Sequence, residues 1–170
     1  LGARRVPTCK VPVIYEAPVA SSLLGHFISA ISGGALYRKA SFLLDHLDKK
    51  IFPEFVRIHE QPLIMGGMGS AAFDGEGVAT SARDIVSDGI LRGYVLGSYS
   101  ARRLELQTTG NAGGVHNLTI DTGDQNLEQM ISGIDEGFLV TELIGFGINN
   151  VTGDYSRGAA GLWIENGEIA

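Results

Sequence analysis

Four histidines are the first candidates for metal chemistry in this sequence, since imidazole is the commonest metal ligand in proteins. They are His26, His46, His59 and His116, and they are separated by 20, 13 and 57 positions. A zinc hydrolase helix carries two histidines on one face and a carboxylate that acts as the base, as in the pattern H-E-x-x-H. No such pair occurs here, so a metal site could form only from distant residues. For His26, which adjoins an apolar helical stripe, we favour a hydrogen-bonded structural role.

Three loops carry polar residues of the kind that bind ligands. Asp74 and Glu76 lie one residue apart in a glycine-rich loop, which could hold a hard cation or a peptide amine, although a solvated turn is the simpler alternative. Asn111 lies in the glycine-rich stretch 108–114, whose backbone N–H groups could face an anion or a peptide carbonyl. The alternative is that this stretch only makes a sharp reversal of the chain. The third loop, residues 152–161, pairs Tyr155 with Asp154 and Arg157. These residues could bind a ligand, but an Asp154–Arg157 pair that stabilises the turn explains them equally well. The candidates for substrate or partner binding are Asp74, Glu76, Asn111, Asp154, Tyr155 and Arg157.

The composition excludes several classes of protein. The 170 residues are 44% hydrophobic and carry a net charge of −6 without clusters of Lys or Arg, which argues against a nucleic-acid-binding surface. No apolar run approaches the length of a membrane helix, and no secretory signal opens the chain, so we expect a cytoplasmic protein. The single Cys9 and the absence of a Gly-x-Ser-x-Gly motif give no sign of a nucleophilic enzyme. The chain starts at Leu1 and stops three residues after Gly167, so we expect a domain truncated at both ends.

The order of apolar and turn residues predicts an α+β fold with a largely antiparallel sheet. A strand over 11–15, a helix from Pro18 to Ile31, a second helix over 40–50 and a further helix opening near Asp124 are expected. The basis for the prediction over 40–50 is a helical stripe of Leu43, Leu44 and Leu47. Asx-Gly turns at 88–89 and 166–167 predict antiparallel hairpins, and residues 138–143 resemble a strand. We expect residues 1–170 to form a single domain.

Five segments closely resemble the C-terminal half of the TldE/PmbA subunits of the TldD/TldE metalloprotease family. They are 21–26 (SSLLGH), 31–43 (ISGGALYRKASFL), 73–80 (FDGEGVAT), 109–114 (TGNAGG) and 151–161 (VTGDYSRGAAG), and they occur in the family's order over nearly the whole chain. The resemblance implies a two-subunit protease in which TldD supplies zinc from an H-E-x-x-x-H helix and a later Cys. It also implies peptide substrates such as microcin precursors or antitoxins, and an older description as a modulator of DNA gyrase.

The resemblance places the zinc motif on the first helix, where this chain lacks the ligands. If the Leu-Leu pair is the anchor, the family's His, Glu and His fall on Gly25, His26 and Ala30. If Gly25-His26 is the anchor, Ser21 and Ser22 take the other two places. One imidazole without a partner or a base cannot hold zinc and activate its water. We therefore expect no catalytic or metal residues and no cofactor in this chain, with zinc in a TldD-like partner.

Two other functions stay open at this stage. One is a non-enzymatic peptide- or protein-binding module of the gyrase-modulator type, which would work without a protease partner. The other is an independent metalloenzyme assembled from dispersed residues, namely His26, His116, Asp74 and Glu76.

Overall fold

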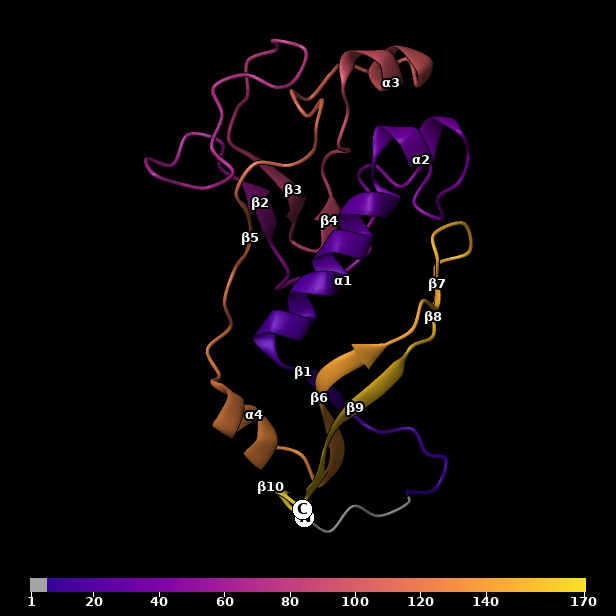
Figure 1. Cartoon of the computed structure of the whole chain (residues 1–170), viewed down its shortest axis with the longest axis vertical. Helices are drawn as coiled ribbons and strands as arrows, with labels where there is room; N and C mark the ends of the chain where they lie inside the picture. Colours follow the sequence, from indigo (N-terminus) through magenta and orange to yellow (C-terminus); the bar gives the residue numbers. More distant parts are fainter. Residues whose placement is uncertain (1–5) are drawn as a thin grey trace. The chain divides into compact units, whose positions relative to one another are not determined.

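The computed structural model describes residues 6–170, which form four helices and ten short strands (Figure 1). The helices are α1 (Ala17–Ala30), α2 (Gly33–Tyr37), α3 (Ser98–Arg103) and α4 (Leu127–Ser132). The strands are β1 (Val13–Tyr15), β2 (Ile58–Glu60), β3 (Arg83–Ser87), β4 (Ile90–Leu91), β5 (Leu118–Ile120), β6 (Glu136–Ile144), β7 (Ile148–Asn149), β8 (Asp154–Tyr155), β9 (Gly158–Glu165) and β10 (Glu168–Ile169). Helices interspersed with mainly antiparallel strands confirm the predicted α+β class.

Two compact units divide the chain. Unit 1 takes in the described part of Leu1–Leu23 together with Asp124–Gly147 and Tyr155–Ala170, and unit 2 consists of Leu24–Gly123 and Ile148–Asp154. The prediction of a single domain over residues 1–170 stays a prediction, because one domain can contain two compact units.

Unit 1 is built on a four-stranded sheet in the order β1-β6-β9-β10. Strands β6, β9 and β10 pair antiparallel, whereas β1 adds to β6 in parallel with Ile14 opposite Leu139. Successive side chains of a strand point to opposite faces, so Ile14 is buried while its neighbour Val13 is half exposed. The core beneath this sheet consists of Ile14, Leu139 and Ile164, against which Ile131 and Ile134 pack.

Unit 2 is built on a fully antiparallel sheet in the order β4-β3-β2-β5. Its core is the larger of the two and includes Ile31, Leu36, Ile58, Ile85 and Leu96, all of them at most 2% exposed. The helical stripe predicted from the sequence is present, because Leu24, Phe27 and Ile28 of α1 pack against this core. Strands β2 and β3 lose their regular register between Ile58 and His59, which marks a bulge in the middle of the sheet.

Both predicted hairpins are confirmed. β3 pairs antiparallel with β4 across Asp88 and Gly89, whose φ angles are 54° and 71°. β9 pairs with β10 across Asn166 and Gly167, whose φ angles are 51° and 81°. Two successive residues with positive φ match the twist of the flanking strands, and an Asx-Gly pair adopts them at low cost.

The helix predicted over 40–50 is wrong. This segment forms consecutive turns, in which Asp45 and Asp48 adopt left-handed φ angles of 60° and 59°. The Ser41 hydroxyl accepts a hydrogen bond from the N–H of Leu43, which gives the backbone an alternative to a helix. Leu44 and Leu47 still pack against the core, so the spacing of these leucines indicated burial and not a helix.

Helices α1 and α4 lie close to their predicted places, whereas the short helix α2 was not predicted. α1 ends at Ala30, and Gly33 opens α2 after Ser32, whose hydroxyl accepts from the N–H of Ala35. The helix expected to open near Asp124 is α4, which begins slightly later because Asn126 and Gln129 form a reciprocal capping box at its start. Within residues 6–170, no helix has both the length and the apolar content needed to cross a membrane.

Replacing Gly89 by Ala should destabilise the protein far more than replacing Gly66 by Ala. The two glycines have nearly equal φ angles of 71° and 73°, so both substitutions incur a left-handed strain of about 1–2 kcal/mol. A Cβ at Gly89 would also overlap the carbonyl oxygens of Phe52 and Pro53, whereas a Cβ at Gly66 meets nothing. We expect about 1–3 kcal/mol of further loss at Gly89, measured by urea unfolding. Equal losses at the two positions would contradict the hairpin packing.

Candidate functional site

The acidic loop is closed on itself by the carboxylate of Asp74. This side chain is buried, and its Oδ1 accepts hydrogen bonds from the N–H groups of Glu76 (2.9 Å) and Val78 (3.0 Å). Its Oδ2 accepts from the N–H of Ala112 (2.9 Å), in the glycine-rich stretch that also carries Asn111. Asp74 therefore joins two of the predicted loops, and both of its oxygens are occupied by backbone donors.

Glu76 binds the start of helix α3. Its Oε2 accepts a hydrogen bond from the N–H of Ser98 at 2.7 Å, where the first backbone donors of a helix lack partners. The N-cap residue Gly97 has no side chain to do this. The exposed carboxylate of Glu76 therefore caps α3 from a separate loop.

These hydrogen bonds lower the pKa of both carboxyl groups. The pKa of Asp74 lies below its usual value chiefly because of the N–H of Ala112, with the N–H groups of Val78 and Glu76 adding to the effect. The pKa of Glu76 is lowered first by the Ser98 side chain and then by the Ser98 N–H. Both groups are therefore charged at neutral pH.

Asn111 sits in a buried polar cluster with Glu60 and Arg83. Glu60 is 2% exposed, and its Oε1 accepts from Arg83 Nε at 2.6 Å. The Asn111 amide donates to both Glu60 oxygens, at 3.2 and 3.0 Å, and its own oxygen accepts from Arg83 Nη2 at 2.8 Å. The N–H of His116 donates to Glu60 Oε2 at 3.0 Å. All these partners of the buried carboxylate come from outside its own strand.

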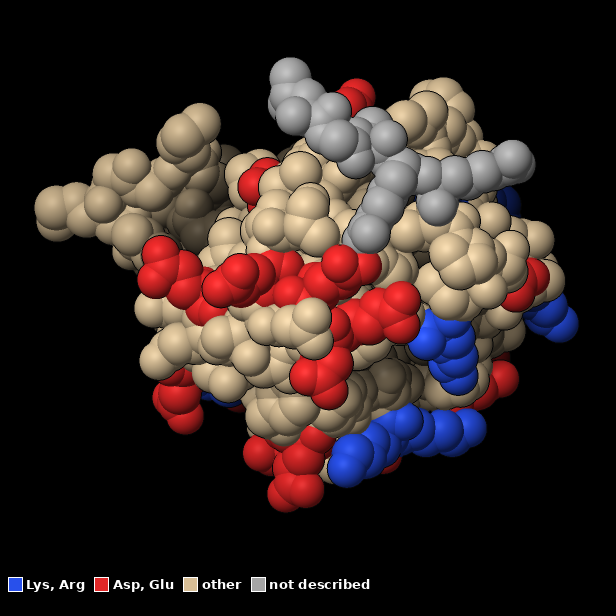
Figure 2. Space-filling view, turned by 90° about the horizontal axis from the view of Figure 1, so that it is seen from below, with Lys and Arg blue, Asp and Glu red and all other residues tan. Residues whose placement is uncertain are grey.

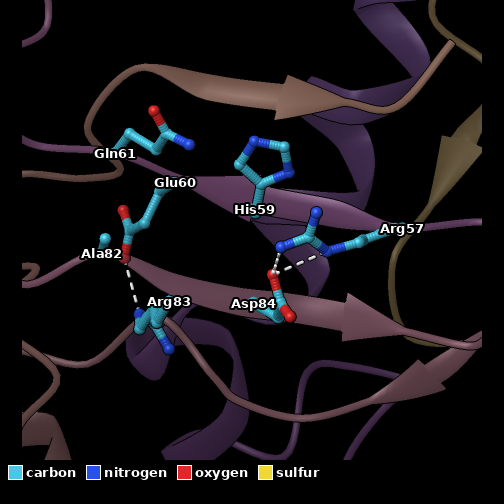
Figure 3. A pocket seen from close by; sticks show the side chains of 7 residues that line it. All are labelled: Arg57, His59, Glu60, Gln61, Ala82, Arg83 and Asp84. Atoms are coloured by element: carbon cyan, nitrogen blue, oxygen red, sulfur yellow. Dashed lines mark hydrogen bonds and ion pairs between the residues drawn. The ribbon is translucent and has the colours of Figure 1, made fainter. Parts of the chain in front are cut away.

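A surface pocket of about 240 Å³ opens over the same strands (Figure 3). Its lining consists of Arg57, His59, Glu60, Gln61, Ala82, Arg83 and Asp84. Figure 3 shows two ion pairs along the pocket, Glu60 with Arg83 and Arg57 with Asp84, and places His59 and Gln61 beside them. The two guanidinium groups balance the two carboxylates, so the lining is close to neutral.

The pocket lining includes one polar side chain, Gln61, whose hydrogen-bonding groups the protein itself leaves unused. His59 is 12% exposed, and its buried Nδ1 has no hydrogen-bond partner, although Asp121 Oδ1 lies 3.4 Å away. The Gln61 amide makes no side-chain hydrogen bond within the part of the chain that the structure describes. A side-chain amide such as that of Gln61 can both donate to and accept from the main-chain groups of a peptide. The lining holds no Ser, Thr or Cys nucleophile.

Arg57 is bound at the pocket rim by two carboxylates. Its guanidinium lies 2.8 Å from Asp84 Oδ1 and 3.4 Å from Asp121 Oδ2. The hydrogen bond to Asp84 is the main reason that the pKa of Arg57 is raised. Because the pair is exposed, it orients the groups more than it stabilises the fold.

The six residues predicted as one binding set fall in both units. Asp74, Glu76 and Asn111 lie in unit 2, where hydrogen bonds connect their loops. Asp154 also belongs to unit 2, and its Oδ2 accepts from the Thr152 hydroxyl at 2.6 Å rather than from Arg157. Tyr155 and Arg157 belong to unit 1. Their roles in binding stay predictions.

Sequence reasoning missed Glu60, Arg83 and the other residues of the pocket except His59, which it named only as a possible metal ligand. Glu60 and Arg83 lie in short strands, and their partners are 23 or more positions away. A charged residue in a strand faces either solvent or a buried partner, and nothing in the sequence distinguishes those two cases.

The residues of α1 do not fit a zinc site. Of the positions where the family's ligands would fall, Ser21 and Ser22 donate their hydroxyls to the carbonyls of Pro18 and Val19, and Gly25 and Ala30 have no ligating group. His26 alone could bind zinc there. Among residues 6–170, no group of three or more His, Cys, Asp or Glu side chains could hold a metal ion.

Comparison with protein families gives one match over nearly the whole chain. Residues 8–170 match the PmbA/TldA metallopeptidase C-terminal domain. Metalloprotease PmbA of Escherichia coli O157:H7 is 52% identical over 169 residues, which cover 99% of this chain and 38% of that protein. The PmbA homolog of Haemophilus influenzae is 48% identical, with the same coverage of both chains. This chain therefore spans 38% of the length of these relatives.

Solved structures agree with the sequence comparison. A candidate modulator of DNA gyrase from Bacteroides thetaiotaomicron superposes with a TM-score of 0.94 at 36% identity, covering 100% of this chain and 38% of that one. TldE from Thermococcus kodakarensis superposes with a TM-score of 0.77 at 26% identity, covering 94% of this chain and 39% of that one.

Replacing Arg83 should lower the free energy of unfolding far more than replacing an exposed arginine. Arg83→Met leaves the buried Glu60 carboxylate without its cation, for which we expect a loss of about 3–5 kcal/mol in the free energy of unfolding. Arg92→Met breaks an exposed pair with Asp48 and should cost about 0–1 kcal/mol. Urea unfolding measures both. The double variant Glu60→Gln with Arg83→Met should recover part of the loss, and no recovery would refute the assigned pairing.

The Asp74 carboxyl should titrate below pH 3.8, its usual value. Since the folded pKa is lowered, this group stabilises the fold above the unfolded pKa, and the stabilisation is lost as pH falls through the folded value. Carboxyl carbon NMR during an acid titration reports the midpoint directly. Asp74→Asn should make stability decline less steeply with acid. A midpoint at or above 3.8 would contradict the three-donor arrangement.

Proposed function

This chain belongs to the PmbA/TldD metallopeptidase family, and we propose that it acts there as the subunit that holds no zinc in a heteromeric cytoplasmic metallopeptidase. The observation that carries the proposal is the composition of α1, which offers one imidazole where a zinc helix needs two ligands and a base. A TldD-like partner would supply the zinc and activate its water. Unfolded peptides of the microcin-precursor or antitoxin type would be the substrates.

The surface pocket of unit 2 suits the role of a substrate wall. Its charges are paired within the protein, whereas the Gln61 amide keeps hydrogen-bonding capacity for a ligand. An unfolded substrate presents mainly backbone N–H and C=O groups, which such a surface binds without demanding a particular sequence. The subunit would therefore hold an extended peptide and leave the cleavage chemistry to its partner.

An apolar loop of unit 2 gives the proposed partner subunit a place to bind. Met65 and Met68 are fully exposed, and Leu63 and Phe73 are 69% and 65% exposed. Exposed apolar side chains gathered in one loop are typical of a protein–protein contact, and methionine adapts its shape to a partner surface. We refer to residues 63–68 as the methionine loop.

Hydrogen bonds hold the methionine loop in shape although its side chains are exposed. The Asn117 amide accepts from the N–H of Gly69 (2.9 Å) and donates to the carbonyl of Gln61 (2.9 Å) and to Ser70 Oγ (2.7 Å). Ser70 Oγ donates in turn to the carbonyl of Ile64 at 2.7 Å. A loop that is already ordered loses less conformational entropy on binding, so it suits a stable subunit contact.

Gln61 links the proposed substrate wall to the proposed partner contact. Its side chain lines the pocket, and its carbonyl accepts the hydrogen bond from Asn117 that supports the methionine loop. A partner bound at the loop would therefore lie next to a peptide in the pocket. This placement favours a shared substrate cleft over a gyrase-modulator type of binding module that works without a protease.

Proteolysis should require both subunits and an intact methionine loop. The intact protein, a TldD-like zinc subunit and their mixture are each incubated with an unfolded peptide, and cleavage is followed with a chelator as control. Only the mixture should cut. Met65→Ser combined with Met68→Ser should lower the rate at limiting concentrations about tenfold or more, because buried methionine surface stabilises the complex. Excess of the zinc subunit should restore the rate.

Phe55→Ser is the matched control, since Phe55 is 85% exposed but lies outside the methionine loop, and it should leave the rate unchanged. His26→Ala should also leave the mixture active. Cleavage by this subunit alone would overturn the assignment of roles. Full activity of the zinc subunit by itself would instead support the binding module without a protease partner.

A further inference from the structure

Unit 1 contains an apolar groove of about 540 Å³ beside helix α4. One side of the groove is formed by the end of β1 and the start of α1, and the other side is formed by α4. Its lining consists of Ile14, Tyr15, Glu16, Ala17, Pro18, Leu127 and Met130. Grooves of this size hold several side chains of a ligand.

The apolar side chains of α4 that line this groove are only partly covered within the described chain. No residue of α4 is buried, and Leu127 and Met130 are 43% and 40% exposed. They lie three positions apart and so share one side of the helix. Ile131 lies on the same face, four positions after Leu127, and packs on the core of unit 1. The apolar face of the helix is thus anchored through Ile131, while Leu127 and Met130 stay partly exposed beside it.

One carboxylate lines this groove, and a second lies on the helix that borders it. Glu16 lines the groove itself, and Glu128 lies in the first turn of α4. The described residues of unit 1 contain eight acidic side chains but only Lys10 and Arg157 as cations. The acidic residues are Glu16, Asp124, Glu128, Asp135, Glu136, Glu142, Glu165 and Glu168. Figure 2, which views the chain from the end where α4 and β10 lie, shows a band of Asp and Glu side chains with Lys and Arg side chains beside part of it.

Tyr15 connects the groove to one of the residues predicted from the sequence. Its side chain hydrogen-bonds that of Tyr155, and burial together with this contact raises the pKa of Tyr15. The Tyr15 phenol is therefore uncharged at neutral pH. It gives the groove a neutral polar position beside its apolar side chains.

We propose that this groove binds a segment of a partner protein that carries both apolar and basic side chains. Apolar side chains fill the space between Ile14 and Met130, and lysine or arginine side chains pair with Glu16 and are favoured by the acidic excess of unit 1. The same charge repels nucleic acid and anionic membranes. A second copy of this chain fits poorly, because it would bring the acidic surface of unit 1 against itself.

A pair of peptides tests this proposal on the intact protein. One fluorescent peptide alternates leucine with lysine, and the other has glutamate in place of each lysine. Fluorescence anisotropy should show saturable binding of the lysine peptide alone, and added salt should weaken it. Glu16→Gln should reduce the affinity about fivefold and Met130→Ser about tenfold.

Two exposed residues at the far end of β6 supply matched controls. Glu142→Gln removes one carboxylate from unit 1 without touching the groove, and Ile144→Ser removes one exposed apolar side chain. Both should change the affinity less than twofold. Equal binding of the two peptides, or an equal loss with Glu142→Gln, would overturn the proposal. So would a self-association that Met130→Ser abolishes and the lysine peptide does not compete with, since a second copy would then occupy the groove.

Discussion

The Glu60 carboxylate determines how the strands and loops of unit 2 meet. It ends β2, pairs with Arg83 at the start of β3, and accepts from Asn111 and the N–H of His116 in the segment that leads to β5. A buried carboxylate is costly unless every oxygen has a partner, so these elements must become ordered together. The Asp74 loop joins the same arrangement through the N–H of Ala112. The pocket above β2 and β3 thus rests on a rigid polar base.

The proposed role, in which this chain holds no zinc, still requires this degree of order. Binding an extended peptide through backbone groups depends on donors and acceptors held at set positions, since each misplaced group forfeits a hydrogen bond. The structure meets this condition in two ways, through ion pairs that hold the charged residues of the pocket and through Asn117, which holds the methionine loop. The same fold can therefore serve a binding role while the metal chemistry belongs to another chain.

Local chemistry made part of this structure predictable. The Asx-Gly hairpins and helix α1 depend on neighbouring residues, and both were expected from the sequence. The helix prediction for residues 40–50 failed because the leucine spacing indicated burial only. The left-handed φ angles of Asp45 and Asp48 give this segment its turns. In the candidate site, Asp74, Glu76 and Asn111 could be picked out because they lie in glycine-rich loops. Their hydrogen-bond partners could not be predicted. Glu60 and Asn111 are 51 positions apart, and no local pattern reveals such a pairing.

The sequence makeup of the two units has a consequence for the order in which they fold during synthesis. Unit 2 is almost one continuous stretch, Leu24–Gly123, whereas unit 1 needs three separate segments. The parallel pairing of β1 with β6 joins Ile14 to Leu139, so the first strand must wait for a residue made much later. Closing such a long loop is slow, and domains emerge from the ribosome starting with their N-terminal parts. The nascent chain is therefore expected to hold β1 unpaired, exposing an open strand to chaperones, until β6 has been translated.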